Sequence, residues 1–198
     1  MEKTLDFLCN NWLETTGAIL SVVYLVLSIK QNIWLWFFGF LSSALYIVVF
    51  FHSKFYADMT LQFYYLVVSV YGAWKWRFGT QEQQQELPVR TVTRLQIIQF
   101  AALSLALWIV YYAVLNYLTD SDVAAADALT TALSIVATWM LAQKILEHWL
   151  VWIFVDAFSS YLYFCKELYP TAVLFIIYTS MAIVGYIQWK RSQTQHNT

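Results

Sequence analysis

Residues 95–118 read LQIIQFAALSLALWIVYYAVLNYL and contain no charged side chain. A helix of this length can cross the hydrocarbon core of a bilayer, which takes about 20 mostly apolar residues. The apolar residues also run on without the two-residue alternation of a membrane barrel strand. The stretch therefore predicts a membrane-spanning α-helix and places the chain among the all-α polytopic membrane proteins.

The composition of the whole chain supports this class. Of its 198 residues 61% are hydrophobic and only 12% are charged, whereas about a quarter of the residues of soluble domains are charged. The net charge of -1, without any basic tract, argues against a nucleic-acid partner. The two cysteines and three histidines are scattered, so we expect no metal site and no cofactor. The expected surroundings are a lipid bilayer.

The apolar stretches predict seven spans, separated by short polar connections. They cover residues Trp12–Ile29, Asn32–Phe51, Ala57–Trp76, Leu95–Leu118, Val123–Ala142, Trp149–Cys165 and Thr171–Trp189. We accordingly divide the chain into a first three-helix bundle (1–77), a cytoplasmic linker (78–94), a connecting helix (95–118), a second three-helix bundle (123–191) and a polar tail (192–198).

The connections differ in their positive charge, which predicts the orientation. Lys3, Lys54 and Lys166 lie on the N-terminal side of the predicted membrane, and the other eight lysines and arginines lie on the opposite side. Cytoplasmic loops carry the excess of positive charge. We therefore expect a multi-pass membrane protein with the N-terminus outside and the C-terminus in the cytoplasm.

The two bundles show a weak internal repeat. At a shift of 116 Trp36 falls on Trp152, and at a shift of 115 Trp74 falls on Trp189. Two three-helix bundles joined by a single helix run parallel, a plan that transporters use with the substrate near the middle of the membrane. The repeat favours transport, although some matches are expected by chance in a chain this rich in aromatic residues.

The sixth predicted span carries an ionisable residue at its centre, which is a candidate functional site because charge is costly inside a membrane. Trp149, Trp152, Asp156 and Ser159 follow one another at spacings of three or four residues, so they share one helical face. Such a face can stack a flat ring and hold a positive charge. The alternative is that the tryptophans lie in the interfacial aromatic belt and Asp156 bonds a neighbouring helix.

The third predicted span shows a similar face with Gln62 and Tyr65. An amide at this depth needs a partner, either the substrate or another helix. Trp36 begins a stripe on the second span for which helix packing is the favoured explanation. Trp76 and Trp189, next to basic residues at span ends, are typical of interfacial anchors.

Several short motifs resemble those of the PnuC-type vitamin transporters. They are Trp36-Phe37-Phe38-Gly39, Tyr56-Ala57-Asp58, Leu61-Gln62, Tyr71-Gly72, Trp74-Lys75-Trp76 and the WxxW motif of Trp149 and Trp152. The resemblance implies a passive carrier with a 3+1+3 helix plan similar to that of the SWEET sugar transporters. It also implies a homo-oligomer, such as a trimer, and dependence on a cytoplasmic kinase that traps the vitamin substrate by phosphorylation.

The resemblance implies nicotinamide riboside as the substrate, with thiamine as the alternative. Both are cations that a carboxylate at Asp156 suits, whereas riboflavin is neutral. The predicted substrate-binding residues are Trp149, Trp152, Asp156, Gln62, Trp36, Tyr65, Ser159 and Tyr178. A retinal receptor would need a lysine deep in the last span, and a membrane enzyme would need a nucleophile or second carboxylate beside Asp156. The sequence shows neither, so we predict a transporter and no enzyme.

Overall fold

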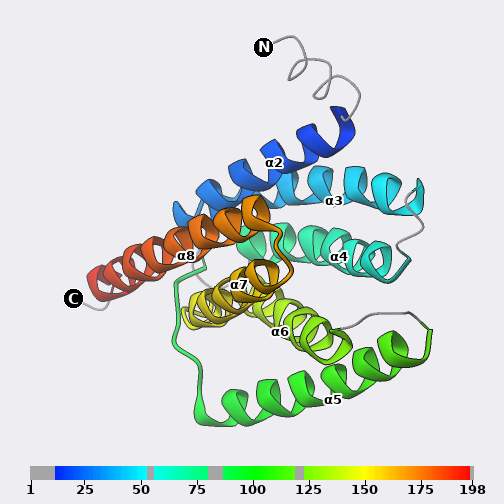
Figure 1. Ribbon diagram of the computed structural model, residues 1–198. Coiled ribbons are helices and arrows are strands. Elements are labelled where there is room, and N and C mark those ends of the chain that lie inside the picture. Colours follow the sequence, from blue (N-terminus) through cyan, green and yellow to red (C-terminus); the bar gives the residue numbers. More distant parts are fainter. Residues whose placement is uncertain (1–11, 53–55, 80–86, 119–122, 197–198) are drawn as a thin grey trace. The chain divides into compact units, whose positions relative to one another are not determined.

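The computed structural model describes residues 12–52, 56–79, 87–118 and 123–196 (Figure 1). The beginning of the first predicted bundle, residues 80–86 of the predicted linker and the last two residues of the predicted tail are among the residues outside these ranges. Throughout the described part, the regular secondary structure is helical, and a single isolated bridge pairs Arg90 with Ile145. The predicted all-α class is confirmed.

The described residues form seven helices, each at the place of a predicted span. Their bounds are α2 Trp12–Ile29, α3 Leu35–His52, α4 Tyr56–Phe78, α5 Arg94–Leu118, α6 Ala124–Ala142, α7 His148–Cys165 and α8 Tyr169–His196. The last helix continues from Trp189 to His196, into the segment expected as a polar tail. Polar side chains on about two more turns do not end a helix, because the segment contains no glycine or proline to break the backbone hydrogen-bond pattern.

Four of these helices, α3, α5, α6 and α8, are long and apolar enough to be candidate membrane spans. The apolar part of α2 is shorter, Ile19–Ile29. The hydropathy of α4 and α7 is lowered by the polar residues that the sequence singled out, such as Gln62 and Asp156. α8 extends for about 42 Å at 1.5 Å per residue, which exceeds the hydrocarbon core of about 30 Å.

The chain divides into two compact units, residues 1–87 and 88–198, which we describe separately. In the first unit α2 packs on α3, and α3 packs on α4 (Figure 1). Small residues bring α2 and α3 close together. The hydroxyls of Ser21 and Ser42 lie 2.9 Å apart, and the Ser42 hydroxyl also donates to the Gly17 carbonyl at 3.3 Å.

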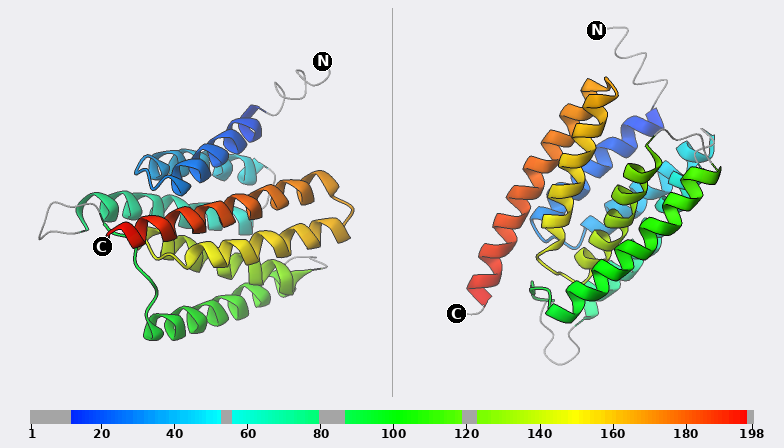
Figure 2. Two further views of the ribbon diagram at one scale, coloured as in Figure 1. Left: turned by 90° about the vertical axis from the view of Figure 1, so that its left-hand side faces the viewer. Right: turned by 60° about the horizontal axis from the view of Figure 1, so that its bottom comes forward.

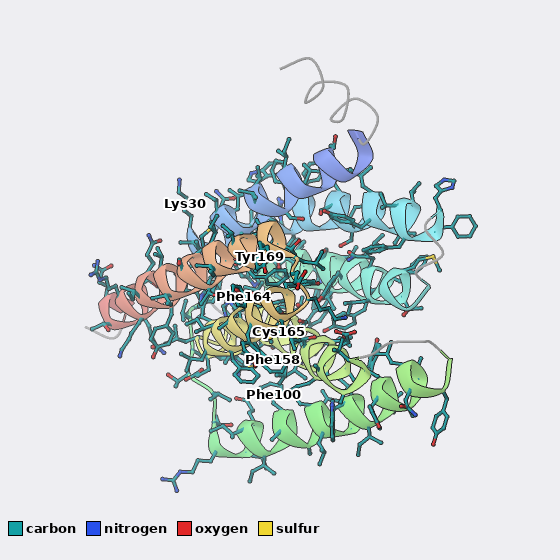
Figure 3. The ribbon with its side chains drawn as sticks, in the orientation of Figure 1. Lys30, Phe100, Phe158, Phe164, Cys165 and Tyr169 are labelled. Atoms are coloured by element: carbon teal, nitrogen blue, oxygen red, sulfur yellow. The ribbon has the colours of Figure 1, made fainter. Side chains whose placement is uncertain are left out.

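In the second unit each helix packs on the next, from α5 through α6 and α7 to α8 (Figure 2). α6 is the most buried of them, because its alanines Ala128 and Ala132 leave room for close approach. Its core residues Val136 and Met140 pack with partly buried neighbours that include Phe100 of α5, which Figure 3 labels.

The segment before α5 is held against the turn between α6 and α7. The Arg90 amide donates to the Lys144 carbonyl at 3.0 Å, and the Leu146 amide donates to the Arg90 carbonyl at 2.9 Å. The Val92 amide donates to the Glu147 carboxylate at 2.9 Å. These bonds join the entry to α5 with the start of α7.

The helices of the first unit recur in the second at a constant separation. The alignment that places Leu35, where α3 begins, on His148, where α7 begins, also places the last residue of α3, His52, on the last residue of α7, Cys165. The same alignment superposes the starts of α4 and α8. We call it the common register. The sequence-based shifts of 116 and 115 were wrong, because single aromatic matches are too frequent to define a register.

The turns that precede α3 and α7 agree with the common register in detail. Gln31 has φ 54° and Lys144, which corresponds to it, has φ 50°, a left-handed conformation that non-glycine residues seldom adopt. The following amide closes the turn in both cases, from Asn32 to the Leu27 carbonyl at 2.9 Å and from Ile145 to the Met140 carbonyl at 3.0 Å. The backbone thus enters both helices in the same way.

Enlarging a buried alanine of α6 should destabilise the second unit. Ala128→Leu adds a side chain where no space exists, and overpacking of this kind costs about 1–3 kcal/mol. We expect a lower Tm of the purified protein in detergent. Ala125→Leu, at an exposed position of the same helix, is the control and should leave the Tm nearly unchanged. Equal Tm values for both variants would contradict the close packing of α6.

Candidate functional site

The middle of α7 carries two buried polar side chains one turn apart. Asp156 is 7% exposed and Ser159 is equally buried, while Trp152, one turn before Asp156, is partly buried. All three lie on one face, because they are separated by four and three residues in a regular helix. α7 therefore presents an indole, a carboxyl group and a hydroxyl along a single line.

No described residue forms a hydrogen bond or an ion pair with the carboxyl group of Asp156. The phenol of Tyr178, on α8, lies near this carboxyl group. Removing a carboxylate from water without a partner is costly. The carboxyl oxygens of Asp156 therefore accept no hydrogen bond from the residues that the structure describes.

Other hydroxyls in these helices do have partners. Thr138 donates to the Ser134 carbonyl at 2.8 Å, and Thr179 donates to the Phe175 carbonyl at 2.8 Å. Ser160 donates across to the Ala172 carbonyl of α8 at 2.9 Å. Ser159 makes no such bond to the described residues, so Asp156 and Ser159 together differ from the polar groups used for helix packing.

Trp149, the first tryptophan of the WxxW motif, lies near the start of α7 and packs against other aromatic rings. It is 1% exposed, with its ring 4.5 Å from that of His148 and 5.8 Å from that of Trp189, between ring centroids. The Nδ1 atom of His148 is 2.7 Å from the Ile145 carbonyl, which ties this group to the turn before α7. Trp149 is thus enclosed within the second unit.

In the first unit Trp36 occupies the corresponding place. It is 2% exposed and its ring lies 5.5 Å from that of Trp76, nearly perpendicular to it. Tyr65, also on α4, is close to Tyr24 of α2. Gln62 is partly buried and makes no hydrogen bond to a described residue.

The structure thus brings together Trp152, Asp156, Ser159 and Tyr178 in the second unit. It does not bring Gln62 to Trp36, because Trp36 packs against α4 at Gly72, about 15 Å along the helix from Gln62. The predicted closeness of Gln62 and Asp156 concerns two units that are described separately and stays a prediction.

Two tryptophans predicted as interfacial anchors are buried instead. Trp76 is 5% exposed and Trp189 is fully buried, whereas their neighbour Trp74 is 56% exposed, as an anchor should be. The sequence reasoning missed their packing role and that of Gly72 and Gly185. The sequence contained a pattern that could have indicated this role, since each glycine lies four residues before a buried tryptophan.

The described helices contain no group of three or more potential metal ligands. Apolar helices that carry one buried, unpaired carboxylate beside aromatic rings are typical of membrane carriers, because intramembrane charges mark substrate paths. The sequence profile of the nicotinamide mononucleotide transporter family matches residues 11–191. The chain belongs to this family. It is a transporter and not an enzyme, as the sequence predicted.

Relatives with different cargoes are about equally similar. The nicotinamide riboside transporter PnuC of Escherichia coli K12 is 24% identical over 212 residues, covering 95% of this chain and 89% of that protein. The riboflavin/roseoflavin transporter RibM of Streptomyces davaonensis is 27% identical over 187 residues, covering 90% and 84%. The crystal structure of the vitamin B3 transporter PnuC has a TM-score of 0.76 and 25% identity, covering 98% of this chain and 87% of that one.

The hydrogen bond of Ser160 is expected to stabilise the α7–α8 pair. Ser160→Ala leaves the Ala172 carbonyl without its donor, and the loss of such a buried bond costs about 1 kcal/mol. We expect a lower Tm in detergent. Ser180→Ala, which removes an exposed bond within α8, is the control and should change the Tm less. The reverse order would contradict the packing described for α7.

Proposed function

We propose that this chain carries nicotinamide riboside across the bacterial inner membrane by facilitated diffusion. The observation that carries the proposal is the buried carboxyl group of Asp156, which has no ion pair among the described residues. A cationic substrate would supply the missing positive charge. The names of the PnuC relatives support the choice of this cation.

The neighbours of Asp156 suit the other parts of such a substrate. Trp152 is partly buried, and its indole would stack on a pyridinium ring, since cation–π contacts are worth about 0.5–2 kcal/mol. Ser159 and Tyr178 would hydrogen-bond the ribose or the amide. Gln62 and Tyr65 provide the same chemistry in the first unit and complete the proposed set.

The proposed carrier follows a 3+1+3 plan with seven spans. α5 connects the two three-helix bundles, and the common register of α3 with α7 and of α4 with α8 supports this division. The N-terminus lies outside and the C-terminus in the cytoplasm, which the lysine and arginine counts support. Substrate moves by alternating access, a cytoplasmic kinase traps it by phosphorylation, and the chain assembles into a homo-oligomer such as a trimer.

Thiamine is the second candidate substrate. It is also a flat cation, so the carboxyl group of Asp156 favours both vitamins over a neutral one. Riboflavin is the third ligand to test, because the relative RibM is named for it and is as similar to this chain as PnuC is. Direct comparison of the three ligands separates these cases.

Equilibrium binding of the purified protein to nicotinamide riboside, thiamine and riboflavin tests the proposal. We expect binding of nicotinamide riboside, and Asp156→Asn should weaken it about tenfold or more, since a hydrogen bond to a charged group is worth about 1.5–3 kcal/mol. Calorimetry or tryptophan fluorescence gives the affinities.

Asp127→Asn is the matched control, because it removes the same charge from α6 of the same unit. It should leave the affinity unchanged. Tight binding of riboflavin alone would overturn the choice of a cation, and equal affinity of wild type and Asp156→Asn at equal Tm would overturn the role of Asp156.

A further inference from the structure

Each unit contains one tryptophan that packs onto a glycine of the next helix. The Trp149 ring of α7 lies on Gly185 of α8, where an added Cβ would be 2.6 Å from the ring. The Trp36 ring of α3 lies on Gly72 of α4, where an added Cβ would clash in the same way. We call these the second and the first Trp–Gly contact.

A second tryptophan completes each contact. Trp189 meets the Trp149 ring edge-on, with 5.8 Å between centroids and an angle of 84°, and Trp76 meets the Trp36 ring with 5.5 Å and 89°. In the common register each of the three residues in the first unit corresponds to the same residue type in the second. The two contacts are therefore the same construction, built into both units at the register of the helices.

The surroundings of Trp149 leave no free face for a substrate ring. His148, Trp189 and Gly185 cover it, and only 1% of its surface is exposed. Among the described residues, neither the indole N–H of Trp149 nor that of Trp36 has a hydrogen-bond partner. The two indoles therefore contribute to the contacts through their shape and not through hydrogen bonding.

We propose that Trp149 is a positioning residue and not a substrate contact. It holds α7 on α8 at Gly185, and so determines where Trp152 and Asp156 lie, one and two turns further along the helix. Trp36 holds α3 on α4 at Gly72 in the same way. The inference rests on the proposed function only where vitamin binding is the measurement.

This role is tested by making the tryptophan of a contact smaller and its glycine larger, first separately and then together. The second contact is examined with Trp149→Phe, Gly185→Ala and the double variant, and the first contact with Trp36→Phe, Gly72→Ala and their double variant. Phenylalanine lacks the outer ring atoms that a Cβ at position 185 would meet. Tm without ligand and the affinity for nicotinamide riboside are measured for every variant.

We expect Gly185→Ala to lower the Tm, because the added methyl group overpacks the contact. It should also weaken binding about tenfold, because the displaced α7 carries Trp152 and Asp156. In the double variant the alanine methyl fills the space that phenylalanine leaves, so both Tm and affinity should recover above those of Gly185→Ala. If Gly185→Ala does not fold, recovery of a folded, binding double variant has the same meaning. The first contact should show the same recovery of Tm.

Trp152→Phe is the matched control, because Trp152 is the substrate-contacting tryptophan of the same motif. Combined with Gly185→Ala it should give no recovery of either quantity. Loss of affinity in Trp149→Phe that the added alanine does not restore would make Trp149 a substrate contact and overturn the proposal. If the Tm changes of the two single variants simply add in the double variant, the proposal is overturned as well, whatever the protein binds. Failure to bind any of the three vitamins would count against the proposed function alone.

Discussion

In the hydrocarbon of a bilayer every backbone N–H and C=O group needs a partner inside the protein, and this requirement governs the whole chain. Helices meet it within single segments. The hydroxyls of Ser69 and Thr130 follow the same rule, since each donates to a carbonyl of its own helix, that of Tyr65 and that of Ala126. The carboxyl group of Asp156 differs from these hydroxyls, because it has no hydrogen-bond partner among the described residues, and a substrate cation is the partner that we propose for it.

The helices could be predicted from the sequence because a membrane helix is recognisable as a long run of apolar residues between polar turns. The bounds of α2 agree with the prediction, and those of α5, α6 and α7 differ by a single residue. The repeat register could not be predicted in this way. Tryptophan and phenylalanine recur so often that several shifts give matches, and only the positive φ angles of Gln31 and Lys144 and the helix ends reveal the common register.

The candidate site was predictable in part, for a physical reason. An ionisable residue at the centre of a span is rare and costly, so Asp156 could be identified without knowledge of its neighbours. The burial of Trp76 and Trp189 could not, because a tryptophan beside a lysine or arginine at a helix end is equally the pattern of an interfacial anchor. Unlike the exposed Trp74, both buried tryptophans follow a glycine by one helical turn. The effect of this glycine depends on the tertiary structure, because it makes room for a tryptophan of the neighbouring helix.

The two units share their packing residues and differ in their polar ones. The tryptophans and glycines of the two Trp–Gly contacts are identical, but in the common register Asp156 corresponds to Ser43, and His148 corresponds to Leu35. The position that corresponds to Trp152 is Gly39, which lies against the ring of Tyr24 and leaves no place for an indole. At this position of the shared helix packing, the second unit therefore has a carboxyl group and the first unit has a hydroxyl group. The two units thus share the packing that positions α3 and α7, while the group proposed to face the substrate cation, the carboxyl group of Asp156, belongs to the second unit.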